Sequence, residues 1–196
     1  MRKWLEEIAL QSEKVRLETL SMAHLEGLRQ AVKDGELWKL WYTSAPEPDA
    51  VEAYIAQALK DLENDQSLPF AILRRSDNQV VGTSRFMHAD ANNRRLEIGT
   101  TWYAKSAQRT GVNTHCKYLL LEYAFETLNC IAVEFRTHWH NQPSRVAIEK
   151  LGAKQDGVLR NHQFDKTGNL RDTVVYSIID REWGTVKQGL AYKMNR

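Results

Sequence analysis

The chain contains 196 residues, with 27 Lys plus Arg against 25 Asp plus Glu and a formal net charge of +2. The length predicts one domain, and 42% hydrophobic with 27% charged residues exclude an intrinsically disordered chain. No apolar run reaches the about 20 residues of a membrane span, and the first residues do not resemble a secretory signal, so we expect a cytoplasmic protein without membrane contact. The slight basic excess does not predict nucleic-acid binding, because phosphate binding requires dense Lys and Arg.

The first third of the chain predicts one strand and two helices. Residues 15–20 alternate apolar and polar types, which indicates a half-buried strand. Ser21 begins a helical pattern over 21–34, and a second amphipathic pattern covers 50–64. Residues 35–49 between them hold an aromatic cluster followed by prolines, which predicts a loop or a short helical turn.

The rest of the chain predicts strands interrupted by two further helices. The strands are expected over 70–75, 80–88, 94–103, 131–139, 157–164 and 173–179, and the helices over 111–128 and 143–152. The order β-α-α-β-β-β-α-β-α-β-β predicts an α/β (α+β) fold with one mixed, mostly antiparallel sheet of six or seven strands flanked by helices. The boundaries are an extension over 1–14, the domain over 15–183 and a tail over 184–196.

The cysteines and histidines do not predict a metal site. Cys116 and Cys130 lack zinc-ligand spacing, and we expect core thiols. His138 and His140 share a face of a predicted strand, but no third ligand is evident near them. We therefore expect no metal and keep His138 as a reserve general base.

The segment from strand 94–103 into helix 111–128 carries the strongest chemical signal. Its loop enters the helix at Gly111, where free backbone N–H groups and the helix dipole can hold a phosphate. The alternative is an ordinary helix start with no ligand. The sequence lacks the P-loop and dinucleotide glycine motifs, which argues against an NTPase and a Rossmann dehydrogenase.

The run Gln108-Arg-Thr-Gly-Val-Asn113 resembles the pyrophosphate loop of the GNAT N-acetyltransferase superfamily. Downstream, Asn141-Gln-Pro-Ser144, the run IEKLGAK and the closing RDTVVYSIIDREW are similar to the RimJ/RimL-like branch, whose members acetylate ribosomal-protein N-termini. The resemblance covers about Val15 to Trp183. Two departures are Asn113 in place of Gly or Ala, and one extra residue between Glu97 and Gly111.

The resemblance implies a GNAT-like domain that binds acetyl-coenzyme A as co-substrate. The pyrophosphate is expected on the loop, and the pantetheine arm along the preceding strand. The implied coenzyme-binding residues are Thr101, Trp102, Tyr103, Gln108, Arg109, Thr110, Gly111, Val112, Asn113, Thr114 and Asn141.

Two residues are the implied catalytic groups. Glu97 occupies a position where related enzymes place a carboxylate that acts as base, directly or through water. The alternative is a solvated strand residue or an ion-pair partner of Arg94 or Arg95. Ser144 would donate to the departing thiolate, although Asn141 or Ser144 could instead cap the following helix.

The aromatic residues Trp38, Trp41 and Tyr42 are the implied acceptor site, because related enzymes place the amine between the first two helices. The alternative is that these rings only cover the sheet edge. Glu36 or Glu47 could attract a cationic amine.

Together these residues predict an N-acetyltransferase that moves acetyl from acetyl-coenzyme A to a primary amine by direct attack in a ternary complex. The acceptor could be a protein N-terminal α-amine or a small amine. A non-catalytic acyl-coenzyme A sensor is the main alternative. Edge strands at the C-terminal end could pair two copies into a homodimer.

Overall fold

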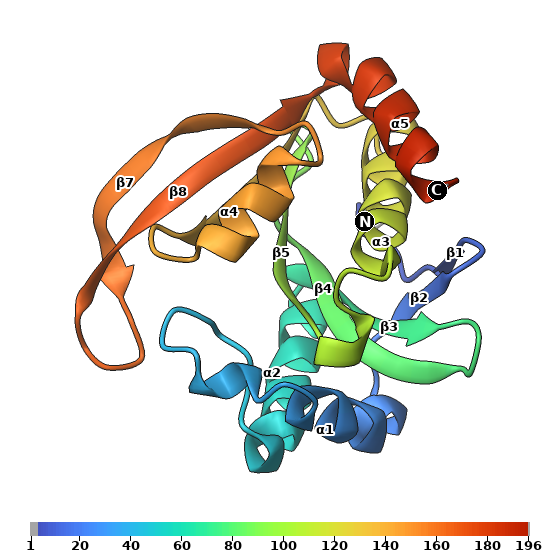
Figure 1. The fold of residues 1–196 in the computed structure, drawn as a ribbon. Helices are drawn as coiled ribbons and strands as arrows, with labels where there is room; N and C mark the ends of the chain where they lie inside the picture. The colour runs from blue at the N-terminus through green and yellow to red at the C-terminus, as the bar shows by residue number, and fades with distance from the viewer. Residues whose placement is uncertain (1–3, 196) are drawn as a thin grey trace.

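The computed structural model describes residues 4–195, and Met1–Lys3 of the predicted extension and Arg196 of the predicted tail lie outside them. A single sheet has the order β1-β2-β3-β4-β5-β6-β8-β7 (Figure 1). Its strands are β1 (Leu10–Gln11), β2 (Val15–Thr19), β3 (Ser67–Arg74), β4 (Gln79–Asp90), β5 (Arg95–Tyr103), β6 (Ala132–His138), β7 (Lys154–Phe164) and β8 (Leu170–Ile179). Among these strands of the described residues, only β5 and β6 pair in parallel, so the predicted mixed, mostly antiparallel α/β sheet is confirmed.

The described residues hold eight strands rather than six or seven, and the addition is β1, which pairs with β2. The helices are α1 (Leu25–Lys33), α2 (Val51–Glu63), α3 (Val112–Glu122), α4 (Gln142–Glu149) and α5 (Asp180–Met194). Helix α5 includes most of the segment predicted as a tail. Strand β7 is the last strand of the sheet, so one of its edges is available to pair with a second copy of the chain. The predicted homodimer would use this edge and stays a prediction.

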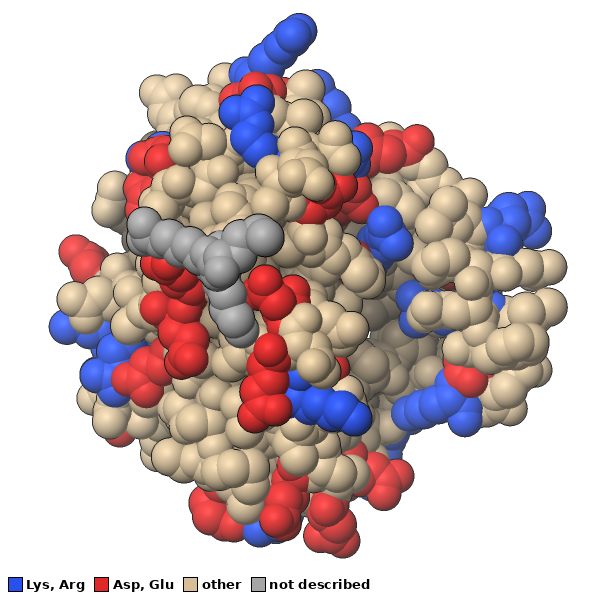
Figure 2. Space-filling model, turned by 180° about the vertical axis from the view of Figure 1, so that it is seen from behind, with Lys and Arg blue, Asp and Glu red and all other residues tan. Residues whose placement is uncertain are grey.

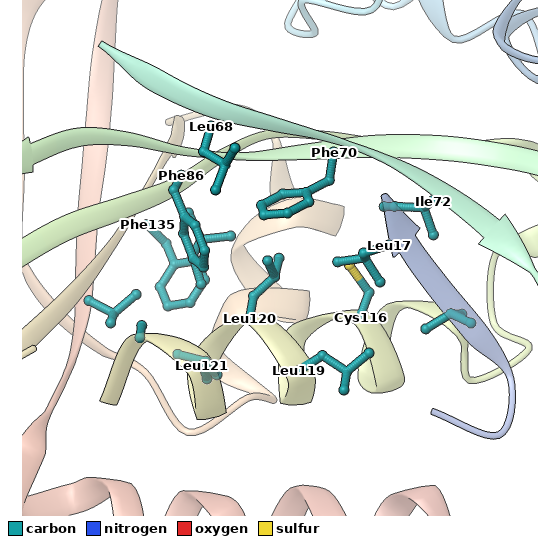
Figure 3. Packing of buried hydrophobic residues seen from close by; sticks show 14 of the residues in the cluster. Leu17, Leu68, Phe70, Ile72, Phe86, Cys116, Leu119, Leu120, Leu121 and Phe135 are labelled. Carbon is teal, nitrogen blue, oxygen red and sulfur yellow. The ribbon is translucent and has the colours of Figure 1, made fainter. Parts of the chain in front are cut away.

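Helix α3 packs its apolar side chains onto one face of the sheet (Figure 3). Leu120 points toward Phe70, and Cys116 lies beside Leu17; all four side chains are fully buried. Each large apolar side chain buried in this way contributes roughly 1.5–3 kcal/mol. Helix α5 covers a second side of α3, which explains why this helix is apolar nearly all round. Both cysteines are buried free thiols, as predicted.

Strands β5 and β6 separate soon after they begin. Their register runs only from Arg95 opposite Ala132 to Glu97 opposite Glu134. Beyond Glu97 the edge of β5 has no β6 partner, so its backbone N–H and C=O groups face the opening between the strands. The opening divides the sheet into β1–β5 on one side and β6, β8 and β7 on the other.

A β-bulge interrupts β5 beside this opening. Thr83 pairs with Trp102 and Arg85 with Gly99, so two residues of β5, Thr100 and Thr101, lie opposite the single residue Ser84. Thr100 has a φ of 49°, an uncommon value for a β-branched residue. Bulges of this kind change which backbone groups and side chains face a site.

The tip of the β7–β8 hairpin reaches the loop between α1 and α2 (Figure 1). The Lys166 ammonium donates hydrogen bonds to the carbonyl oxygens of Trp38 at 2.6 Å and Leu40 at 3.2 Å. Seen from behind, the surface is hollowed between the body of the molecule and the hairpin lobe, with Lys and Arg side chains at the rim (Figure 2).

Candidate active site

The predicted pyrophosphate loop forms an exposed cradle at the start of α3. Gly111 adopts a φ of 92°, and the first backbone hydrogen bond of the helix runs from the His115 N–H to the Gly111 carbonyl at 3.0 Å. The N–H groups of Val112, Asn113 and Thr114 therefore precede the helical ladder and are available to an anion. The residues present fit a pyrophosphate held by backbone amides.

Contacts within the loop hold this cradle in place. The Thr110 hydroxyl donates to the Ala107 carbonyl at 2.7 Å, and the Gln108 amide donates to the Tyr103 carbonyl at 3.1 Å. The Asp34 carboxylate at the end of α1 accepts from the Ser106 N–H at 2.9 Å, and hydrogen bonding from the Ser106 side chain and backbone lowers the pKa of Asp34. The Gln108 side chain thus shapes the loop, while Arg109 remains exposed.

Lys14 is a candidate phosphate contact that the sequence analysis did not identify. Its ammonium lies 3.4 Å from the Thr110 carbonyl and 3.1 Å from the position that a Cβ at Gly111 would occupy. A hollow of about 530 Å³ beside it is also lined by Arg74 and Arg75. No local sequence pattern indicates this contact, because Lys14 lies 96 residues before Thr110. The pairing of β2 with β3 brings Lys14, in the turn before β2, close to the loop.

The three predicted contacts on β5 differ in orientation. The Thr101 hydroxyl faces α3, where it accepts from the Lys117 ammonium at 2.7 Å. Trp102 is buried in the core, and burial raises the pKa of Tyr103 well above its usual range. Any contact with a pantetheine arm would therefore use the backbone of this strand.

Glu97 is buried at the point where β5 and β6 separate. Its Oε2 lies 2.9 Å from Nδ1 of His88 and 3.4 Å from Nε of Arg136, so neither Arg94 nor Arg95 is the ion-pair partner. Its Oε1 lies 2.8 Å from where a Cβ at Gly99 would be. One oxygen of the carboxylate is anchored, and the other lies against a glycine next to the bulge.

Ser144 lies in the first turn of α4. The Asn141 side-chain oxygen accepts from the Ser144 N–H at 3.2 Å, so Asn141 is the helix cap and Ser144 is not. Among the described residues the Ser144 hydroxyl has no hydrogen-bond partner, and the residue is half-buried. Its hydroxyl is thus free to donate, whereas the Asn141 oxygen is already engaged.

The aromatic residues of the α1–α2 loop do not act as one surface. Trp41 is 46% exposed and lines a pocket of about 540 Å³ together with residues 138–140 at the end of β6 and several residues of the β7–β8 tip, which we call the hairpin pocket. Tyr42 packs edge-on against Trp41 at 5.6 Å between ring centroids. Trp38 packs against the core, and its carbonyl holds Lys166.

The imidazole of His138 has no free lone pair. Its Nδ1 accepts from the His140 N–H at 3.0 Å, so the neutral ring carries its proton on Nε2. Burial, together with the charge of Arg171, lowers the pKa of His138. This tautomer argues against the reserve role as general base. Over residues 4–195 no group of three or more metal-ligating side chains is found, and no helix is long and apolar enough to cross a membrane.

Lys117 is a second polar residue that the sequence analysis did not identify. It is 5% exposed between α3 and the sheet, and its ammonium donates to Thr101 at 2.7 Å and Ser84 at 3.2 Å. Burial lowers its pKa to about 8. The sequence did not indicate a role for Lys117, because the apolar helical pattern around it predicts only core side chains.

The comparisons with known proteins agree with this architecture. Residues 14–154 match the family model described as an acetyltransferase (GNAT) domain. The chain is 27% identical to the uncharacterized N-acetyltransferase p20 of Bacillus licheniformis over 89% of this chain and 97% of that protein. It is 33% identical to the "Putative ribosomal N-acetyltransferase YdaF" of Bacillus subtilis (strain 168), over 55% of this chain and 57% of that protein.

A solved structure is similar over nearly the whole chain. A GCN5-related N-acetyltransferase from Brucella melitensis superposes with a TM-score of 0.87 at 28% identity, over 97% of this chain and 86% of that one. The family match and this structural similarity assign the chain an acetyltransferase fold. The chain belongs to the GNAT acetyltransferase family and is an acetyl-coenzyme A-dependent N-acetyltransferase.

Proposed function

We propose that the chain acetylates a primary amine by direct attack in a ternary complex. The observation that carries this proposal is the opening between β5 and β6. Free helix amides lie at its coenzyme end, Glu97 lies at the point of separation, and the hairpin pocket provides space for an acceptor. Acetyl-coenzyme A supplies an activated thioester. The amine nitrogen bonds to the acetyl carbon while the carbon–sulfur bond breaks, so one proton leaves nitrogen and one reaches sulfur.

Glu97 is the proposed general base. His88 and Arg136 fix its Oε2, which leaves Oε1 as the oxygen that can accept a proton from the amine or from an intervening water. A general base accelerates the reaction least for an α-amine, because its pKa near 8 leaves part of it neutral at physiological pH. It accelerates the reaction most for a lysine side chain, whose pKa is near 10.4.

Ser144 is the proposed donor to the thiolate. Asn141 provides the helix cap, so the serine hydroxyl has no structural hydrogen bond to lose. Ser144→Ala should lower turnover about tenfold or more and leave acetyl-coenzyme A affinity within about twofold. Turnover equal to that of the unchanged chain would remove Ser144 from the mechanism.

The acceptor that we favour is a protein N-terminal α-amine. Support comes from the name of YdaF, which refers to ribosomal N-acetylation, and from the wide, surface-exposed hairpin pocket. A small free amine is the second candidate, since the pocket volume of about 540 Å³ also accommodates one.

A thiol-release assay with acetyl-coenzyme A tests the proposal over a panel of short peptides, polyamines, amino acids and aminoglycosides. We expect amine-dependent release, highest for peptides with a free α-amine and absent for their N-acetylated forms. Coenzyme binding without release for any amine would instead support the sensor, and that binding should then survive Glu97→Gln and Ser144→Ala.

A further inference from the structure

A closed polar cluster lies inside the molecule, where α3 crosses β4 and β5. It consists of Lys117, Ser84 and Thr101, and we call it the lysine cluster. The hydroxyls of Ser84 and Thr101 are 2.7 Å apart, and the lysine ammonium donates to both. Hydroxyls are neutral, and among residues 4–195 no carboxylate forms an ion pair with Lys117. The cation is buried with two of its three N–H groups hydrogen-bonded and with its charge uncompensated.

This arrangement is costly for a purely structural contact. A buried ammonium without a counter-charge is disfavoured, and an apolar side chain of similar length would fill the same space in the core. Groups in such environments occur preferentially at functional sites. The position of the cluster suggests what this residue does.

Both hydroxyls of the lysine cluster lie at the β-bulge. Ser84 is the residue that Thr100 and Thr101 together oppose, so Lys117 contacts both strands where their register changes. On the free edge of β5 the register of the bulge decides which N–H groups face the opening. Helix α3, which carries Lys117, also begins at the coenzyme loop.

We propose that Lys117 is a positioning residue that fixes the bulge of β5, and thereby the backbone donors of that strand, relative to the coenzyme loop at the start of α3. It acts through Thr101 and touches neither substrate. The inference extends the proposed function, because correctly placed backbone N–H groups at the opening would stabilise the negative charge that develops on the acetyl oxygen.

The test compares Lys117→Met, Thr101→Val and the double variant in the full-length protein. If Lys117 acts through Thr101, each single change lowers kcat about tenfold with less than a threefold change in the KM for acetyl-coenzyme A. The double variant should then be no slower than the slower single variant. Lys60→Met, an exposed lysine on α2, is the control for the loss of one ammonium and should match the unchanged chain.

A readout without catalysis separates this inference from the proposed function. Amide hydrogen exchange should quicken at Thr100 to Trp102 in Lys117→Met, while the amides of Leu96 and Ile98 on the same strand keep their protection. That result supports the positioning role even if no acceptor is found. If Lys117→Met does not fold, Thr101→Val alone supplies both measurements.

Two results would overturn the positioning role. One is multiplicative losses of kcat in the double variant, since these mean that the two residues act independently. The other is a lower melting temperature with unchanged kcat and unchanged exchange at the bulge, which would leave Lys117 as a core residue only.

Discussion

The two ends of the opening between β5 and β6 each hold a buried basic side chain, and the two differ in their hydrogen-bond partners. Lys117, on the coenzyme side, has its ammonium bonded to two hydroxyls of the core. His138, on the acceptor side, has one nitrogen bonded to backbone, and its Nε2 is without a partner among the described residues.

The difference follows from how each end is built. The coenzyme end consists of β4, β5 and α3, which are packed regular elements of the sheet and the helix that covers it. The hairpin pocket is assembled from a loop, a strand end and a hairpin tip. A scaffold can hold one invariant ligand at the rigid end and vary the other through its loops.

The largest expected effect comes from Glu97, which lies between the two ends. Glu97→Gln should lower kcat by about 100-fold or more, since removing a general base costs roughly 10²–10⁴. Acetyl-coenzyme A affinity, measured by calorimetry, should not change. The matched control is Glu134→Gln, its register partner on β6, which also contacts Arg136. Equal losses in both variants would indicate a general charge effect rather than a base.

Lys117→Met probes the coenzyme end through stability. Burial lowers the pKa of Lys117 from 10.5 to about 8, so between these values the unfolded chain binds a proton that the folded chain does not. Stability from this group therefore rises with pH from about 8 to 10.5 and is lowest below pH 8. We expect urea unfolding to show that the difference in unfolding free energy between the unchanged chain and Lys117→Met changes by at most about 3 kcal/mol over this pH range. A constant difference would mean that Lys117 keeps an ordinary pKa.

A pair of glycine substitutions sets one end directly against the other. Gly111 and Gly168 have φ values of 92° and 84°, so alanine strains the backbone at both, and at Gly111 its Cβ would also lie 3.1 Å from the Lys14 ammonium. Gly111→Ala should raise the KM for acetyl-coenzyme A about five- to tenfold, and Gly168→Ala should change only the acceptor KM. If both substitutions change the KM of the same substrate, the coenzyme end and the acceptor end do not act independently.

Trp41→Ala should have the smallest effect. Because Trp41 is 46% exposed, its loss should cost little stability, while the acceptor KM rises about threefold and kcat stays within twofold. Leu159→Ala, a comparably exposed apolar side chain of β7 outside the hairpin pocket, serves as the control. A fall in melting temperature with an unchanged acceptor KM would assign Trp41 to structure.

The sequence predicts the coenzyme end better than the acceptor end for a physical reason. Strand β5, its loop and α3 follow one another along the chain, so their periodicity and Gly111 indicate the arrangement directly. Lys14, Lys117 and the His88–Glu97 contact depend on strand pairing and helix packing, which no local pattern encodes. Strand β1 has only two residues, too few for an alternating pattern.

The contact of Lys166 with Trp38 joins residues 128 positions apart, so one wall of the hairpin pocket meets the other only after most of the chain has folded. The entropic cost of such a closure grows slowly with chain length, and two hydrogen bonds from one ammonium maintain it. Changes in the length of either loop would reshape the pocket without touching the coenzyme cradle. If the hairpin pocket receives the acceptor as proposed, acceptor choice can evolve on the surface by insertion and deletion, while the residues proposed for acetyl transfer stay unchanged.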